Sequence, residues 1–341
     1  MRKLLNLFKY PVIYTFITIL IFRNLVLNIT TNLIDWGDSA FIAWQISMLM
    51  DKILSFNFSN FYTLNTNYPF PLTALFTDSF LTQAILSLPF FFIKNPVVLY
   101  NIFLLLTIIA NYLTAHLLFK RAFKKDLLAF AASFFINNSF FVYDQIIHLQ
   151  TLSLWPLFLS LFLLLKLEKE PKIKYGLLLG ILLAIQFGSS VYLAIFQAVM
   201  LAVFSFFLFI FNRNKLELAK TGIASFVLFI ALTYPTLIKP YLEFEKLYHK
   251  IRDINEIIMN SGEPTDLLFP IKGTLLASIP TVESFLRFNK HSAAEKLYFP
   301  GITLLLGTLA GLFLQKFSFK KRSLLTQNKY SWMDTSMSAI F

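Results

Sequence analysis

The chain carries repeated apolar stretches of about 20 residues, the length at which a helix crosses the ~30 Å hydrocarbon core of a bilayer. These stretches occupy residues 10–31, 78–93, 96–119, 127–143, 151–167, 175–189, 191–211, 219–238 and 297–315. They are rich in Phe, Leu and Ile and lack the alternation that a transmembrane barrel requires. The sequence therefore predicts an all-α fold, a polytopic transmembrane helical bundle with about eight or nine membrane segments. Such a chain is expected in the cell membrane as a multi-pass protein.

Composition supports this class and excludes others. Apolar residues make up 57% of the 341 residues and charged residues only 14%, more apolar surface than a soluble chain of this size can bury. The net charge of +12 is explained by the Lys and Arg that collect beside anionic lipids, so we expect no nucleic-acid partner. The absence of Cys excludes disulfides, Cys-ligated zinc and thiol nucleophiles.

The basic residues orient the expected spans. They cluster at residues 120–125, 166–174, 213–220 and 316–322. The positive-inside rule places these clusters and the N-terminus on the cytoplasmic side. Residues 32–77 and 239–296 then become two long extracytoplasmic loops containing interfacial helices. The stretch 78–93 is short and contains Pro89, so whether it crosses, re-enters or bends stays open.

We interpret residues 1–316 as one membrane domain and residues 317–341 as a basic and polar tail. Within the first external loop, residues 39–54 have apolar side chains at helical spacing after Ser39, a residue that suits a helix N-cap. An amphipathic helix lying in the membrane interface is expected there.

Two carboxylates next to the expected spans are candidates for chemistry. Asp38 lies in the segment Asp35-Trp36-Gly37-Asp38-Ser39. Either Asp38 or Ser39 caps the following helix, or the Asp38 carboxylate deprotonates a hydroxyl or binds a divalent cation. Asp78 begins an apolar stretch, where it is either an N-cap or a second carboxylate of an active site.

Further polar residues lie between apolar stretches. His148 and Gln150 are expected either to be solvated or to hydrogen-bond a sugar or phosphate. Tyr192 follows Ser189-Ser190, which form either a short turn or a polar island in a site. Glu295 is either an interfacial charge beside Lys296 or a substrate contact.

Nucleotide and zinc motifs are absent from the sequence. Neither GxxxxGK[ST] nor GxGxxG occurs, which argues against ATP-driven transport within this chain. HExxH is also missing, which argues against a zincin-type metalloprotease.

The order of several short segments resembles that of a known family. The segments are Gly37-Asp38-Ser39, Asn67-Tyr68-Pro69-Phe70-Pro71, Thr77-Asp78-Ser79-Phe80-Leu81-Thr82-Gln83-Ala84, Leu88-Pro89-Phe90, Asn95-Pro96-Val97, Tyr100-Asn101, His148-Leu149-Gln150, Trp155-Pro156-Leu157, Ser189-Ser190-Val191-Tyr192, Pro240-Tyr241-Leu242 and Glu295 before Phe299-Pro300-Gly301. Over about residues 10–315 the chain resembles the bacterial multi-spanning glycosyltransferases of the GT-C superfamily, which are related to the protein mannosyltransferases.

The resemblance implies transfer of a sugar from a polyprenyl-phosphate-linked donor to an extracytoplasmic acceptor hydroxyl of a cell-envelope glycan, lipid or protein. It implies that Asp38 is the catalytic base or a metal ligand, and that Asp78, His148, Gln150, Tyr192 and Glu295 are candidates for substrate contacts. Many relatives carry an Asp-Glu pair where this chain has Asp38-Ser39. The cofactor requirement stays unknown, with a divalent cation as one option.

Two other classes stay open. A non-enzymatic permease or flippase for lipid-linked saccharides would favour broken helices and charges near the bilayer midplane. This chain instead concentrates acidic residues toward one face of the expected bundle. Relatives commonly continue with more spans or a soluble domain, so the tail at 317–341 also fits a truncated form or an assembly subunit.

Overall fold

A computed structural model of the chain describes residues 2–66, 68–212 and 214–249, together with residues 253–255, 258, 279 and 280. The chain divides into two compact units. The first, Met1–Asn138 with Val142–Ile257, carries the helices discussed below. The second, Ser139–Phe141 with Ile258–Phe341, lies almost wholly outside the described residues.

Every regular element in the described part of the chain is helical, which confirms the all-α prediction there. In chain order the elements are α1 (Arg2–Ile21), α2 (Arg23–Leu27), α3 (Asp38–Leu54), η1 (Thr73–Phe76), α4 (Leu81–Ser87), η2 (Leu88–Phe90), α5 (Pro96–Phe123), α6 (Asp126–Asn137), α7 (Phe140–Asp144), η3 (Gln145–Ile147), α8 (Leu149–Leu152), α9 (Trp155–Leu167), α10 (Ile173–Ser189), α11 (Val191–Phe211), α12 (Lys215–Thr233), η4 (Tyr234–Ile238) and α13 (Lys239–Tyr248).

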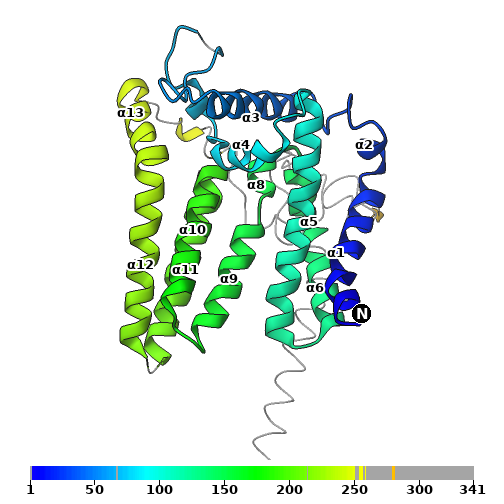
Figure 1. The fold of residues 1–341 in the computed structure, drawn as a ribbon, viewed down its shortest axis with the longest axis vertical. Coiled ribbons are helices and arrows are strands. Elements are labelled where there is room, and N and C mark those ends of the chain that lie inside the picture. The colour runs from blue at the N-terminus through cyan, green and yellow to red at the C-terminus, as the bar shows by residue number, and fades with distance from the viewer. Residues whose placement is uncertain are drawn as a thin grey trace, which may run out of the picture. The chain divides into compact units, whose positions relative to one another are not determined.

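The long helices α5, α9, α10, α11 and α12 run lengthwise beside one another, and α3 lies across one end of them (Figure 1). We call this the α3 end. The C-termini of α5 and α9 and the N-termini of α6, α10 and α12 lie at the opposite end (Figure 1). The basic clusters predicted at 120–125 and 166–174 therefore share the end opposite α3.

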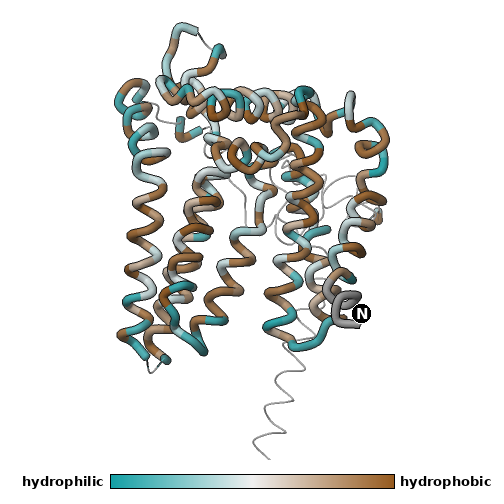
Figure 2. The backbone as a smooth tube through the Cα atoms, in the orientation of Figure 1, coloured by the Kyte–Doolittle hydropathy of each residue, from teal (hydrophilic) through white to brown (hydrophobic). Residues whose placement is uncertain are grey.

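Four helices are long and apolar enough to cross a membrane, judged by length and composition. They are Pro96–Phe123, Leu149–Leu167, Val191–Phe211 and Lys215–Tyr248. Shorter apolar helices cover Phe8–Ile21, Leu81–Phe90, Asp126–Asn137 and Ile173–Ser189. Figure 2 shows apolar residues along the lengths of these helices and hydrophilic residues mainly toward their two ends. A helical membrane protein accounts for this distribution.

The helix expected over residues 39–54 is confirmed as α3, which begins one residue earlier. Ile42, Ile46 and Leu49 recur at helical spacing and are buried, as an amphipathic helix requires. Asp51, on the same helix, is exposed. Burial of this single apolar stripe fixes how α3 packs across the α3 end.

The short stretch 78–93 forms α4 and the 3₁₀ turn η2 instead of a full span. The seven residues of α4 rise only about 10 Å, and Pro89 lies in η2. α4 packs against α3, α5 and α10, at the α3 end (Figure 1). Of this stretch and the next, only α5 meets the length and composition expected of a membrane-spanning helix.

Two of the predicted apolar stretches are interrupted and do not form single helices. The stretch 10–31 divides into α1 and α2, and the stretch 127–143 breaks between α6 and α7. At the start of the expected loop 239–296, the helix continues to Tyr248 through the π-helical turn η4. Pro235 and Pro240 cannot donate backbone hydrogen bonds, and a wider turn is one way for a helix to accommodate them.

Several predictions lie outside the described residues. They are most of the loop after residue 249, Glu295, the stretch 297–315 and the tail 317–341.

Hydrogen bonds attach the loop after α3 both to α3 and to the π-helical turn η4. The Lys52 ammonium donates to the carbonyl oxygens of Asn60, Phe61 and Thr63 at 2.8, 3.1 and 2.7 Å. The Tyr62 hydroxyl donates to the carbonyl oxygen of Thr236 at 2.6 Å. These bonds order the segment after α3 and join it to the π-helical turn.

A small aromatic cluster joins the next part of this loop to α13. The ring of Phe76 lies 4.9 Å from the rings of both Phe244 and Tyr248, measured between centroids. The π-helical turn and the end of the helix are therefore both attached to the first loop.

Candidate functional site

The start of α3 is held by Asp35 and not by the residues that the sequence favoured as caps. The Asp35 carboxylate accepts from the backbone N–H of Gly37 at 2.5 Å and of Ser39 at 3.0 Å. A Cβ atom at Gly37 would lie 2.9 Å from the Asp35 carboxylate, so glycine leaves the room this contact needs. Burial alone would raise the pKa of Asp35, but these N–H donors outweigh it and hold the pKa below its usual range.

Because Asp35 supplies the capping oxygens, the Asp38 side chain is available for another contact. Its carboxylate oxygen lies 2.9 Å from Nε2 of His148. The Asp38 side chain is 59% exposed and that of His148 is 20% exposed. Asp38 and His148, 110 residues apart in the chain, thus form an Asp–His pair that stays open to an incoming molecule.

Hydrogen bonds between buried hydroxyl groups hold the residues next to the Asp–His pair. Ser39 is fully buried, and its Oγ donates to the carbonyl oxygen of Ile147 at 3.4 Å. The hydroxyl of Tyr100, on α5, donates to Ser39 Oγ at 3.1 Å. The residues next to Asp38 and His148 are therefore joined to each other and to the long helix α5.

Asp78 occupies a second polar position. It does not cap α4, as one interpretation of the sequence expected. Its Oδ1 instead accepts from the backbone N–H of Val191, the first residue of α11, at 2.9 Å. Burial raises the pKa of Asp78 to about 6, although hydrogen bonds from Val191 and Ser190 favour the carboxylate.

Gln45 connects α3, which carries Asp38, to the backbone at Asp78. Its amide nitrogen donates to the carbonyl oxygens of Ala74 at 3.1 Å and Asp78 at 3.2 Å. Gln45 follows Asp38 by two helical turns, so the two residues share a face of α3 about 10 Å apart. No hydrogen bond or ion pair between Asp38 and Asp78 is found among the described residues.

The segment after Asp78 closes the end of α10. Ser79 donates to the carbonyl oxygen of Gly188 at 3.2 Å, and Thr82 donates to that of Ile185 at 2.6 Å. Gln83 donates to the Ser189 hydroxyl at 2.5 Å. The Ser79 bond satisfies one of the carbonyl groups that a helix C-terminus leaves without partners, and the Gln83 bond gives Ser189 of the predicted polar island a structural role.

The other predicted site residues are less closely connected. Gln150 follows His148 on α8, and its buried side-chain carbonyl oxygen has no hydrogen-bond donor among the described residues. Tyr192 is 54% exposed on the first turn of α11. Glu295 lies outside the described residues. The structure therefore joins Asp38 to His148, and no hydrogen bond among the described residues links Asp78, Gln150 or Tyr192 to that pair.

A metal site is not apparent in the described part of the chain. There, no group of three or more His, Cys, Asp or Glu side chains is placed to hold an ion. The Asp–His pair offers two ligands at most, and its short hydrogen bond already uses one atom of each residue.

Sequence reasoning missed three residues that position the site: Asp35, Gln45 and Tyr100. The sequence does not single out Asp35, because Asp38 and Ser39 suit an N-cap equally well. Gln45 had a weak signal, as a lone amide on the apolar face of a helix, where a polar group needs a partner. Tyr100 had no local signal, because its partner Ser39 lies 61 residues away.

The Asp38 carboxylate is in contact with the His148 imidazole at 2.9 Å and can orient it, an arrangement in which one group positions another that can act as a base. Comparisons with family models, with curated proteins and with solved structures give no significant match to this chain.

Proposed function

We propose that the protein is a membrane glycosyltransferase that moves a sugar from a polyprenyl-phosphate-linked donor to an acceptor hydroxyl. The observation that carries the proposal is the 2.9 Å contact between Asp38 and His148 at one end of an apolar helical bundle. A donor with a lipid tail and a polar sugar matches a site where apolar helices end in polar groups. The proposal includes about eight or nine membrane segments, with shorter helices and residues 297–315 adding to the four long ones.

The proposed step needs one base. The acceptor oxygen attacks the anomeric carbon, the bond from that carbon to the lipid phosphate oxygen breaks, and the lipid phosphate leaves with the bonding electrons. The proton of the acceptor hydroxyl passes to the Asp–His pair. A single displacement of this kind inverts the configuration at the anomeric carbon. Asp78, with its raised pKa, and Tyr192 are proposed to contact the substrates.

A permease or flippase for lipid-linked saccharides is the second candidate. It is favoured by the interrupted helices, since α6 and α7 are separated near Asn138 and a π-helical turn interrupts the helix from Lys215 to Tyr248. Broken helices are a feature of transporter sites. In the described residues, however, the exposed Asp–His pair lies at an end of the bundle and not midway along it.

The test is sugar transfer in proteoliposomes supplied with pooled radiolabelled polyprenyl-phosphate sugars and cell-envelope acceptor. Wild type is compared with Asp38→Asn and with Asp51→Asn, which neutralises an exposed carboxylate elsewhere on α3. Loss of the base is expected to lower the rate at least ~100-fold. Asp51→Asn is expected to retain the wild-type rate.

The outcomes separate the candidates. Equal transfer by wild type and Asp38→Asn would keep the enzyme and discard the Asp–His pair as its base. No transfer by any folded variant would overturn the transferase. In that case, movement of a fluorescent lipid-linked saccharide between leaflets of the same vesicles would establish the flippase.

A further inference from the structure

Two glycines bring α12 unusually close to α10. Gly176 and Gly180 lie one turn apart on α10, the small-residue spacing that lets membrane helices approach. A Cβ atom at either position would collide with the backbone of α12, at the carbonyl groups of Thr221 and Ser225. This contact fixes α10 and α12 as a tight pair.

Helix α11 does not share this close packing. Only Ala194 and Gln197 of its 21 residues are buried, and both lie in its N-terminal third. Toward the end opposite α3, a cavity of about 570 Å³ remains between α11 and the neighbouring helices α9, α10 and α12. Its volume is in the range of ligand pockets.

The lining of this cavity suits a hydrocarbon chain. It is mainly Leu, Phe and Ala, with the hydroxyl residues Ser205 on α11 and Thr221 and Ser225 on α12. The Thr221 hydroxyl is already satisfied by the Glu217 carbonyl oxygen at 2.7 Å. Gly222 also lines the cavity, and a Cβ atom there would meet no atom within 4 Å.

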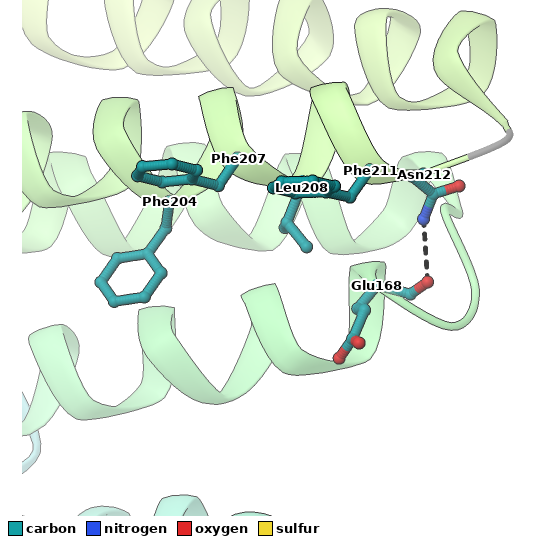
Figure 3. Close-up of a pocket in the computed structure, with 6 residues that line it drawn as sticks. All are labelled: Glu168, Phe204, Phe207, Leu208, Phe211 and Asn212. Atoms are coloured by element: carbon teal, nitrogen blue, oxygen red, sulfur yellow. Dashed lines mark hydrogen bonds between the residues drawn. The ribbon is translucent and has the colours of Figure 1, made fainter. Parts of the chain in front are cut away.

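A second hollow of about 490 Å³ lies on another side of α11 and differs in charge. Figure 3 shows Phe204, Phe207 and Phe211 of α11 near Glu168, whose backbone carbonyl accepts from the Asn212 side chain at 2.9 Å. The Glu168 carboxylate gives this hollow a negative charge. It is therefore unsuited to an anionic headgroup.

The 570 Å³ cavity instead has a cation close to one of the residues that line it. The Lys215 ammonium lies 5.8 Å from the centre of the Phe209 ring, and Phe209 lines the cavity. Lys215 forms no ion pair with any carboxylate of the described residues, whereas the nearby Lys220 is paired with Glu217 at 2.7 Å. Its charge is free to bind an anion.

We propose that this cavity binds one acyl chain of an anionic phospholipid, whose phosphate is held by Lys215. The apolar lining receives the chain, and the unpaired ammonium selects the negative headgroup. The site is at the opposite end of the bundle from the Asp–His pair, and it does not depend on the proposed sugar transfer.

Native mass spectrometry of the purified full chain, titrated with dioleoyl-phosphatidylglycerol or dioleoyl-phosphatidylcholine, tests the proposal. Wild type is expected to bind phosphatidylglycerol more tightly. Gly222→Leu, which fills the cavity from an open position, is expected to weaken that binding at least tenfold. Lys215→Gln should weaken phosphatidylglycerol about fivefold and leave phosphatidylcholine unchanged.

Val227→Leu is the matched control. This substitution adds bulk at an exposed position on the same helix and should leave the binding of both lipids unchanged. Equal binding of the two lipids, or wild-type binding by Gly222→Leu, would overturn the proposal. Glycerol phosphate that competes as strongly as the lipid would show a headgroup site with no role for the chain. A change of oligomeric state in Gly222→Leu, with lipid binding intact, would show that a second copy fills the cavity.

Discussion

The two ends of the helical bundle hold their charged groups in different ways. At the α3 end, several polar contacts join residues that are far apart in the chain, as between Asp38 and His148 or between Asp78 and Val191, beside the local bonds of Asp35 and Lys52. At the opposite end, charges pair with near neighbours in sequence: Lys120 with Asp126 at 2.7 Å and Glu170 with Lys172 at 2.6 Å.

This difference distinguishes a site that the fold preorganises from a solvent-exposed surface. A long-range contact exists only in the folded chain, so its partners are oriented before any substrate arrives. Local pairs between half-exposed side chains contribute little, because water and salt screen them and both side chains lose freedom. Chemistry is therefore expected at the α3 end, and the basic end is expected to orient the chain in the membrane and to recruit lipid.

The largest effect is expected from a double-mutant cycle on the Asp–His pair. Asp38→Asn and His148→Gln are each expected to lower sugar transfer at least ~100-fold, and the double variant is expected to lose little more. Residues that act as one unit are strongly non-additive. Initial rates in proteoliposomes measure all four proteins. Fully multiplicative losses would show that the two residues act separately.

A large effect on stability is expected from Asn101→Ala. The buried Asn101 amide donates to the carbonyl oxygens of Ile29 and Asn32 at 2.9 and 2.7 Å. Its removal leaves both without that donor and should lower the free energy of unfolding by about 1–3 kcal/mol. Thermal unfolding in detergent micelles measures this. Asn24→Ala, at an exposed position of α2, is the control; equal shifts would contradict the proposed role of burial.

Asp78 is expected to make stability depend on pH. Its pKa is about 6 in the folded chain, above the ordinary value of 3.8, so the folded state holds an extra proton between these values. The corresponding stability is present below pH 4 and is lost as pH rises through 6, by at most about 1.4 kcal/mol per pH unit.

Asp78→Asn keeps an acceptor oxygen for Val191 and removes this titration. Melting temperatures from pH 4 to 7.5 should therefore fall for wild type relative to Asp78→Asn. Parallel curves for wild type and Asp78→Asn would show that the Asp78 pKa is ordinary.

The smallest effect is expected at the basic end. The side chains of Lys120 and Asp126 are 52% and 50% exposed. Replacing both, as Lys120→Gln with Asp126→Asn, should change the free energy of unfolding by less than about 1 kcal/mol, and less still in high salt. Sugar transfer should be unchanged. A loss comparable to that of Asn101→Ala would remove the contrast between the two ends.

The sequence predicts α10 and α11 well. Both are continuous apolar runs bounded by polar residues, and their observed bounds differ from the predicted 175–189 and 191–211 by two residues at most. It fails at Asn138, whose side chain donates to the Phe134 carbonyl oxygen and the Tyr112 hydroxyl. Such local bonding competes with the helix, and hydropathy does not detect it.

The candidate site is predictable only in part. Asp38 and His148 each stood out beside apolar stretches, and their contact was beyond reach because 110 residues separate them. The choice of Asp35 as the cap also depends on three-dimensional geometry, since three acceptors compete within five residues. The local sequence indicates which residues can take part in chemistry, whereas their contacts with one another can be identified only in the folded structure.

The π-helical turn at Tyr234–Ile238 changes the direction in which the side chains after it point around the helix axis. A helix with one additional residue in a turn presents everything beyond it rotated by about 100° relative to an uninterrupted α-helix. Phe244 and Tyr248 meet Phe76 of the first loop under that offset. Deleting a single residue at the turn would rotate Phe244 and Tyr248 away from Phe76. The number of residues in the turn, and not only their identity, therefore determines which residues the helix contacts.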